Sequence, residues 1–141
     1  MQRTKEELIA IGNSISKNTL METLGIEMID FGDKFVVGRM PVNSRVHQPD
    51  GVLHGGATAA LAESVGSFAA HLFVDTAEVF VRGIEITANH IKTVKEGYVY
   101  AKATFIHHGR TTQLLDIRIT DDHDNLISIC RLSTVSLPRK K

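Results

Sequence analysis

The stretch His47–Val74, HQPDGVLHGGATAALAESVGSFAAHLFV, decides how the rest of the chain folds. Its second half is almost uniformly small or apolar, and three alanines between Ala57 and Ala60 favour a helix. A helix that is apolar nearly all round is normally buried inside a protein. The run is about as long as a membrane span, but Glu63 and two histidines interrupt it. We therefore expect a buried helix that begins near Gly55, and not a membrane-spanning one.

Alternating apolar and polar residues predict two β-strands before this helix and four after it. The six ranges are 26–31, 34–41, 79–92, 97–107, 113–120 and 125–137. Short connections between consecutive strands favour an antiparallel meander, whose apolar face needs a cover. Capping signals at Thr4 and Thr19 add an N-terminal helical segment, which we expect only to pack. The sequence thus predicts a single α+β domain, residues 1–141, in which a curved antiparallel sheet of five to six strands wraps around one long central helix.

The composition narrows the classes of function. The 16 Lys and Arg residues balance the 16 Asp and Glu residues, which argues against a protein that binds nucleic acid through bulk positive charge. The single cysteine, Cys130, excludes a disulfide framework and a cysteine zinc site within one chain. The seven histidines show neither His-x-His nor HExxH spacing, so we expect no metal and no other cofactor. The N-terminus lacks the apolar core of a secretory signal, and we expect a cytoplasmic protein without a membrane partner.

Glu63 is the most informative polar residue of the central helix. A carboxylate among apolar residues is costly unless it is paired or protonated, and no Lys or Arg lies within a helical turn of it. Desolvation makes such a carboxylate a stronger base, which suits a general base or a nucleophile. Ser67 follows four residues later, on the same helix face. An exposed helix face, or a polar contact between subunits, explains Glu63 equally well.

The start of the helix, His54-Gly55-Gly56, is the second candidate feature. Glycines there leave the first backbone N–H groups uncovered. Together with the positive end of the helix dipole, those donors can bind a carbonyl oxygen that becomes negative. Gln48 and His54 add side chains able to orient a substrate. Adjacent glycines are also ordinary turn formers, which is the simpler explanation when they are taken alone.

The spacing of these two features bears on assembly. Gly55 and Glu63 lie about 12 Å apart along one helix at about 1.5 Å per residue, so one small carbonyl group cannot touch both. Either the features are unrelated, or Glu63 of one chain meets Gly55 of another across a two-fold axis. The second alternative predicts an obligate homodimer with two composite sites.

The loop His107–Thr112, HHGRTT, joins two predicted strands and is a candidate phosphate site. Arg110, with nearby hydroxyl and N–H donors, can grip a phosphate. His90 and Lys92 end the long strand before it and add positive charge if they lie next to the loop. A plain polar turn is an equally good explanation of this segment.

The motif HQPDGVLHGGATAALAESVGS, residues 47–67, resembles the helix motif of hotdog-fold acyl-CoA thioesterases. The likeness is greatest to the 4-hydroxybenzoyl-CoA thioesterase branch with a catalytic glutamate, and within it to the enterobactin-proofreading, 1,4-dihydroxy-2-naphthoyl-CoA and phenylacetate-pathway enzymes. It extends over nearly the whole chain, through GIEITANHIK at 83–92 and RLSTVSL at 131–137. The resemblance implies a hotdog fold, hydrolysis of a thioester, and dimers that commonly form homotetramers.

The resemblance also implies roles for individual residues. Glu63 resembles the carboxylate that acts as nucleophile or activates water, and Gly55 the residue whose N–H polarises the thioester carbonyl. Gln48 and His54 resemble the polar pair that lines the site, and Ser67 the residue that positions the hydrolytic partner. Segments of relatives that contact coenzyme A match Gly83, His90, Ile91, Lys92, Thr93, His107, His108, Gly109, Arg110, Thr111 and Thr112.

Three departures from the family pattern bear on the substrate. Asp50 stands where relatives often carry an apolar residue, and Arg82 where a small or apolar residue is usual. Lys92-Thr93 replaces a common Arg-Pro, which keeps the charge but loses bidentate phosphate binding. We expect hydrolysis of an acyl-CoA, with an aryl or hydroxyaryl acyl group, to free CoA and a carboxylic acid.

Three alternatives stay open at this point. A non-catalytic acyl-CoA or acyl-carrier binding protein could use the same fold, although binding alone does not require a buried acid. A thioesterase could act on carrier-protein thioesters in place of CoA thioesters. A hydratase or dehydratase would spare the thioester, but the Asp–His pair typical of those enzymes is absent from this helix.

Overall fold

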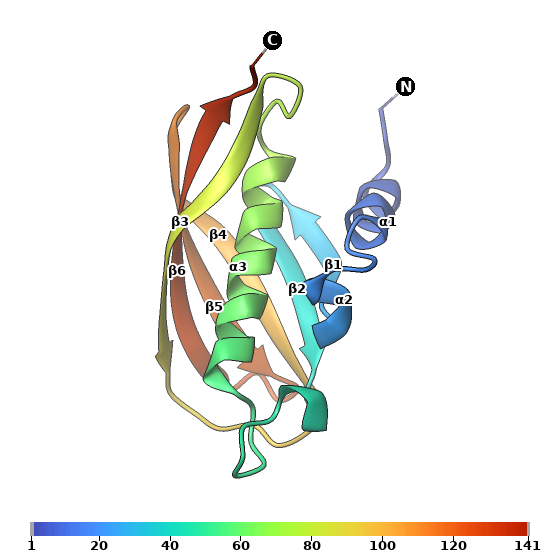
Figure 1. Ribbon diagram of the computed structural model, residues 1–141, viewed down its shortest axis with the longest axis vertical. Helices are drawn as coiled ribbons and strands as arrows, with labels where there is room; N and C mark the ends of the chain where they lie inside the picture. Colours follow the sequence, from blue (N-terminus) through green and yellow to red (C-terminus); the bar gives the residue numbers. More distant parts are fainter. Residues whose placement is uncertain (1, 141) are drawn as a thin grey trace.

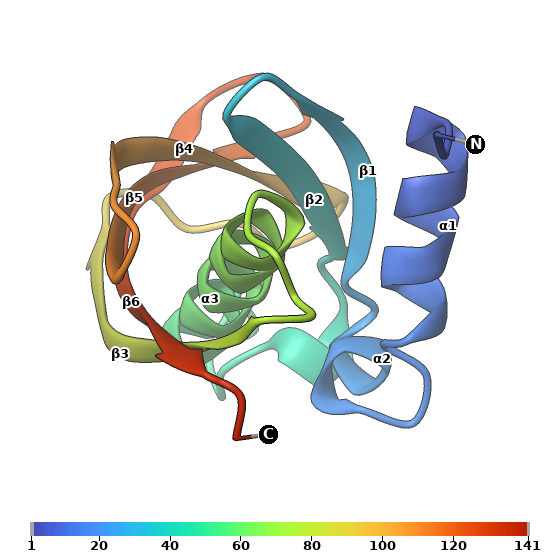
Figure 2. The ribbon, with the colours of Figure 1, turned by 90° about the horizontal axis from the view of Figure 1, so that it is seen from above.

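The structure is a computed structural model that describes residues 2–140. Its elements in chain order are α1 (Lys5–Ser14), α2 (Leu20–Leu24), β1 (Glu27–Gly32), β2 (Phe35–Pro41), the 3₁₀ helix η1 (Ser44–Val46), α3 (Gly55–Leu72), β3 (Val79–His90), β4 (Tyr98–His108), β5 (Thr112–Asp121) and β6 (Leu126–Pro138). The six strands form one antiparallel sheet in the order β1-β2-β4-β5-β6-β3. The sheet curves around α3, and α1 and α2 lie to one side (Figures 1 and 2). The predicted hotdog architecture is confirmed.

The N-terminal helices begin where the capping signals place them. Thr4 and Glu7 form a reciprocal capping box, and the Thr19 side chain accepts a hydrogen bond from the Met21 N–H. Gly25 ends α2 with a φ of 74°, a left-handed conformation that suits glycine. Helix α1 ends at Ser14, and the chain then turns through Asn18, which has a φ of 61°.

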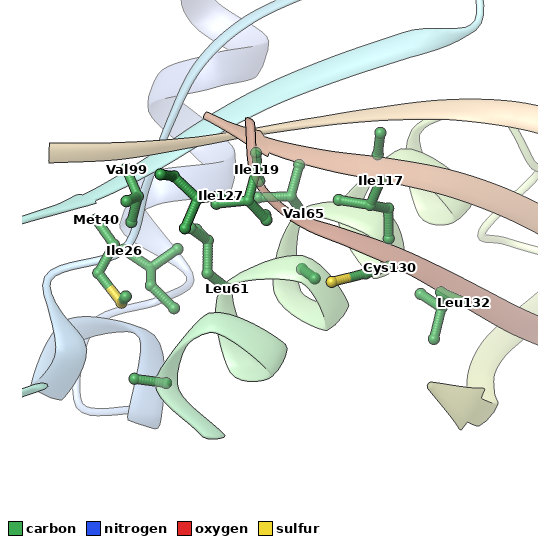
Figure 3. Packing of buried hydrophobic residues seen from close by; sticks show 14 of the residues in the cluster. Ile26, Met40, Leu61, Val65, Val99, Ile117, Ile119, Ile127, Cys130 and Leu132 are labelled. Atoms are coloured by element: carbon green, nitrogen blue, oxygen red, sulfur yellow. The ribbon is translucent and has the colours of Figure 1, made fainter. Parts of the chain in front are cut away.

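The core lies between α3 and the concave face of the sheet. Small residues along the buried side of α3 let the helix approach the strands closely. A Cβ atom on Gly66 would lie 2.7 Å from Leu132 Cδ2 and 2.9 Å from Ile117 Cδ1, so a side chain here would force these two core side chains to move. Figure 3 shows Leu61 and Val65 of α3 packed among Ile117, Leu132 and other apolar residues of the strands. None of the helices within residues 2–140 is both long and apolar enough to cross a bilayer.

The order of the strands differs from the expected meander. Strands β4, β5 and β6 do follow one another across the sheet, but β3 pairs with β6 and not with β4. Both sides of β4 are occupied, by β2 and β5. The segment 91–97 therefore carries the chain from one side of the sheet to the other (Figure 1). Strand β3 becomes an edge strand with an unpaired side.

The inward and outward pattern of β3 also differs from simple alternation. Its register with β6 shifts between Gly83 and Glu85. The extra residue of this bulge, Ile84, is 62% exposed, whereas strict alternation along the predicted strand 79–92 would put it on the same face as Ile86 and Ala88. The inserted residue shifts the alternation of inward and outward side chains by one position. Odd-numbered Val81 before the bulge and even-numbered Ile86 after it therefore both face inward.

Candidate active site

Glu63 lies halfway along α3, half-buried and close to the edge strand. A Cβ atom on Gly83 would lie 2.8 Å from Glu63 Oε1, so the carboxylate rests against the backbone of β3 at its bulge. Within residues 2–140, no Lys, Arg or His nitrogen lies within ion-pair distance of this carboxylate. The structure places Gly83, one of the residues predicted to contact CoA, beneath the Glu63 carboxylate.

A groove of about 630 Å³ opens beside Glu63, between α3 and the N-terminal helices. Glu63 and Ser67 both line it, so the structure brings these two predicted residues together. The remaining lining is mostly apolar and includes Leu8, Ile11, Ile15, Leu20, Phe68 and Leu72. The N-terminal helices were expected only to pack, and this contribution to the groove was missed. The exposed side chains of Ile15 and Leu20 indicate this contribution, because apolar residues left open beside an acid mark a binding surface.

The start of α3 presents a free backbone donor. His54 is the N-cap residue, and its Nδ1 accepts a hydrogen bond of 2.8 Å from the Gly56 N–H. The Gly55 N–H has no acceptor among residues 2–140. His54, expected to line the site, thus fixes the helix start by capping it.

A pocket of about 190 Å³ surrounds this free donor. Its lining brings together Gln48, Val52, Leu53, Gly55, Thr58, His90, Ile91, Lys92, Thr93 and Ile127. The Gln48 side chain donates a hydrogen bond of 2.9 Å to Asp50 Oδ1, so Asp50, one of the departures from the family pattern, holds Gln48. His90 was expected at a phosphate, but its ring lies against Gly55: a Cβ atom there would be 2.8 Å from His90 Nε2.

Gly55 and Glu63 therefore line different cavities of one chain. The two segments proposed to bind phosphate, one with His90 and Lys92 and the other the loop His107–Thr112, also line different cavities. His108, Gly109 and Arg110 line a separate cavity of about 370 Å³ with Val79 and Glu78. On β6, the partner of His90 is Ser128 and the partner of Thr112 is Val135, which puts the segments about 23 Å apart at about 3.3 Å per residue. Within one chain, His90 and Lys92 therefore do not lie next to Arg110.

The loop between β4 and β5 is held by local contacts. The His108 ring stacks on Phe105 with centroids 4.4 Å apart, and the Gly109 N–H donates to the Thr112 carbonyl. Gln113 donates to the Gly109 carbonyl at 2.9 Å. Arg110 forms no ion pair within residues 2–140, although Asp75 and Glu78 line the same cavity.

Two further observations concern the chemistry of the site. Burial raises the pKa of the Cys130 thiol, and the contact of the thiol with the Ser128 hydroxyl group opposes that shift only in part. Within residues 2–140, no three His, Cys, Asp or Glu side chains are placed so that they could hold a metal ion.

Comparisons with known proteins agree with this geometry. The family model described as the thioesterase superfamily matches residues 50–128. The esterase PA1618 of Pseudomonas aeruginosa is 44% identical over 126 residues, 89% of this chain and 87% of the relative. The proofreading thioesterase EntH of Cronobacter turicensis is 43% identical over 122 residues, 86% of this chain and 88% of the relative.

Solved structures extend the likeness to the whole fold. A crystal structure of a PA1618 thioesterase variant matches with a TM-score of 0.91 at 41% identity, over 99% of this chain and 97% of that one. A thioesterase from Haemophilus influenzae matches with a TM-score of 0.89 at 38% identity, over 98% and 93% of the two chains. The chain belongs to the thioesterase superfamily and is an enzyme that hydrolyses acyl thioesters.

Proposed function

We propose that this enzyme hydrolyses an acyl-CoA, with an aryl or hydroxyaryl acyl group, to free CoA and a carboxylic acid. This places it in the 4-hydroxybenzoyl-CoA thioesterase branch that uses a catalytic glutamate. One observation carries the proposal: among residues 2–140, a single helix presents a carboxylate without an ion-pair partner at Glu63 and an N–H donor without an acceptor at Gly55, in two separate cavities. A thioester needs both groups, one to polarise its carbonyl and one to deliver or activate the nucleophile.

A homodimer built on the free edge of β3 joins the two cavities. Glu63 lies over Gly83, and Gly55 lies against His90. Antiparallel pairing of Gly83 with the partner's His90 puts a two-fold axis between Ile86 and Thr87. That register carries the partner's Gly55 toward Glu63, which produces two composite sites per dimer. Pairing also satisfies the unpaired backbone groups of a long edge strand.

The same register reunites the two candidate CoA segments. It carries the partner's Val79 beyond the His90 end of β3, where Lys92 and Thr93 follow in the chain. Arg110 lines the same cavity as Val79, so the partner's Arg110 moves toward Lys92. One subunit and its partner then supply the cations that a CoA phosphate group requires. A tetramer of such dimers and a cytoplasmic location stay predictions.

In the proposed reaction, the Gly55 N–H donates to the thioester carbonyl oxygen and stabilises the negative charge that develops there. Glu63 of the other subunit attacks the carbonyl carbon, or removes a proton from a water molecule that attacks it. Ser67, which lines the same groove as Glu63, is placed to orient that water. The carbon–sulfur bond then breaks, and the sulfur of CoA leaves as a thiolate that takes up a proton. If Glu63 attacks directly, the product of this step is an anhydride between the acyl group and Glu63, and a water molecule then hydrolyses it to release the carboxylic acid and restore the Glu63 carboxylate. The apolar groove beside Glu63 receives the acyl group, since its lining suits a ring or a chain and not a charged group.

Two matched pairs of variants test this proposal by thiol release from a panel of aryl and aliphatic acyl-CoAs and one aryl carrier protein. Glu63→Gln should lower kcat by about 10²- to 10⁴-fold, whereas Glu96→Gln, at an exposed position, should leave it unchanged. Gly55→Pro removes the N–H and adds the carbons of the proline ring, and the backbone should tolerate it, because proline suits the first helical position and the extended backbone of His54 suits a following proline. It should lower kcat by about 10²- to 10³-fold.

Gly55→Ala is the control for the added carbon, because it keeps the N–H, and it should retain more activity than Gly55→Pro. Near wild-type turnover by Glu63→Gln would show that Glu63 is not the catalytic carboxylate. Binding of acyl-CoAs without thiol release across the whole panel would favour the non-catalytic binding protein. Faster release from the carrier protein than from every acyl-CoA would move the substrate class to carrier-protein thioesters.

A further inference from the structure

The His90 ring occupies a position that the hydrolytic steps above do not use. It ends β3, lies against Gly55 and lines the same pocket as Gln48. Its Nε2 faces Gly55, and its Nδ1 lies 3.1 Å from the hydroxyl oxygen of Ser128 on β6. One ring nitrogen is therefore held inside the fold and the other is presented at the site.

The surroundings of Ser128 determine which nitrogen carries the hydrogen. Ser128 is fully buried, and its single hydroxyl hydrogen is donated to the Asn89 carbonyl at 3.0 Å. The nearby Cys130 thiol, 3.5 Å away, keeps its own proton because burial raises its pKa. Toward His90 the Ser128 oxygen can therefore only accept, so Nδ1 is the protonated nitrogen. The Nε2 of the neutral ring is left as an acceptor.

The pocket thus offers a donor, the Gly55 N–H, beside an acceptor, His90 Nε2. A pantetheine thioester carries the complementary pair. Its carbonyl oxygen accepts a hydrogen bond, and two carbons beyond its sulfur the cysteamine arm bears an amide N–H. CoA and carrier proteins share this arm, whereas a simple alkyl thioester lacks it.

We propose that His90 Nε2 accepts a hydrogen bond from the cysteamine amide N–H of the thiol arm, and that Ser128 is the positioning residue that fixes its tautomer. The inference rests on the proposed thioester hydrolysis. It gives the enzyme a means to recognise the pantetheine arm independently of the acyl group and of the phosphates. Both Gly55 and His90 belong to one chain, so the recognition does not depend on the register of the dimer.

Two synthetic substrates isolate this hydrogen bond. Both carry the acyl group that the enzyme hydrolyses best: one as its N-acetylcysteamine thioester, the other as the S-(2-acetoxyethyl) thioester, in which an oxygen replaces the amide N–H. The wild-type enzyme should prefer the amide over the ester by about fivefold in kcat/KM, the worth of one neutral hydrogen bond. His90→Ala should lower kcat/KM for the amide and bring the preference to about one, whereas His123→Ala, in an exposed turn, should leave it unchanged.

The preference separates recognition from structural damage, because a misfolded variant loses both substrates in proportion. Ser128→Ala should reduce the preference without abolishing it, since the ring stays but its tautomer is no longer fixed. His90→Gln, which keeps an acceptor, should retain part of it. An unchanged preference in His90→Ala, or equal wild-type rates on the two substrates, overturns this inference alone. Absence of thiol release from both substrates and from every acyl-CoA overturns the proposed function, and the inference with it.

Discussion

Gly83→Ala tests whether the position of the Glu63 carboxylate over the edge strand is the catalytic one. The backbone of Gly83 is outside the left-handed region, so it accepts a side chain without strain of its own. The new Cβ atom would lie 2.8 Å from Glu63 Oε1, where ordinary contacts begin at 3.4 Å. The carboxylate must therefore retreat by about 0.6 Å. It is the end of a flexible side chain, so the fold should accommodate the change.

The magnitude follows from the sensitivity of catalysis to position. A misplacement of about 1 Å can lower a rate by about 100-fold. A shift of about 0.6 Å should then lower kcat by roughly tenfold, with little change in the melting temperature. Thiol release at saturating acyl-CoA measures kcat, and gel filtration checks that the variant keeps the assembly of the wild type.

A double-mutant cycle identifies the cause. Glu63→Asp shortens the side chain by one methylene and withdraws the carboxylate from residue 83. On that background Gly83→Ala should lower kcat less than it does on the wild type, with a coupling of about 0.5 kcal/mol or more. If Gly83→Ala keeps wild-type kcat while Glu63→Gln is inactive, the observed contact is not the catalytic arrangement.

Three further predictions concern the acyl groove, the phosphate contacts and a surface turn. Gly12→Ala, whose Cβ would meet the Phe68 ring, should push that ring toward the groove and raise KM for the bulkiest acyl-CoAs more than for the smallest, as measured over a size series. Arg110→Ala should raise KM for acyl-CoA several-fold and leave the N-acetylcysteamine thioester, which has no phosphate, unaffected. The hydrogen bond from the Asn125 side chain lowers the pKa of Asp121 in the folded protein. The ionised Asp121 therefore stabilises the fold at pH values above the carboxyl pKa of the unfolded chain, and this stabilisation is lost as the pH falls through the pKa of the folded protein. Asn125→Ala should raise the pKa of Asp121, as measured by an NMR titration.

The features that local sequence signals determine were predictable. The Ala-rich run and the glycines before it placed α3, and the caps at Thr4 and Thr19 placed the helices before it. The spacing of Gly55 and Glu63 along one helix already indicated that one small carbonyl group cannot touch both residues of the same chain. Helical geometry is set over a few residues, so sequence alone determines these relations.

Relations between distant segments were not accessible in the same way. The predicted meander was wrong because the order of the strands depends on which strand edges remain free for pairing. Both edges of β4 are paired, with β2 and β5, so β3 pairs with β6 instead. The contacts of Glu63 with Gly83 and of His90 with Gly55 join residues on different elements, through the bulge and the end of β3. The contribution of α1 and α2 to the groove was missed. Capping signals predict where these helices begin, but they do not predict which of their side chains face α3 across the groove.

The central claim is that one chain supplies Gly55 and the other supplies Glu63 to each site, and complementation between two inactive variants tests it most directly. Gly55→Pro and Glu63→Gln are mixed in equal amounts, unfolded together and refolded, with each variant alone as the control. Random pairing gives hybrid dimers in half the population, each with one intact composite site and one site that lacks both groups. The account predicts recovery of about one quarter of the wild-type thiol release. A mixture no more active than the two variants refolded alone would show that each site is built within a single chain.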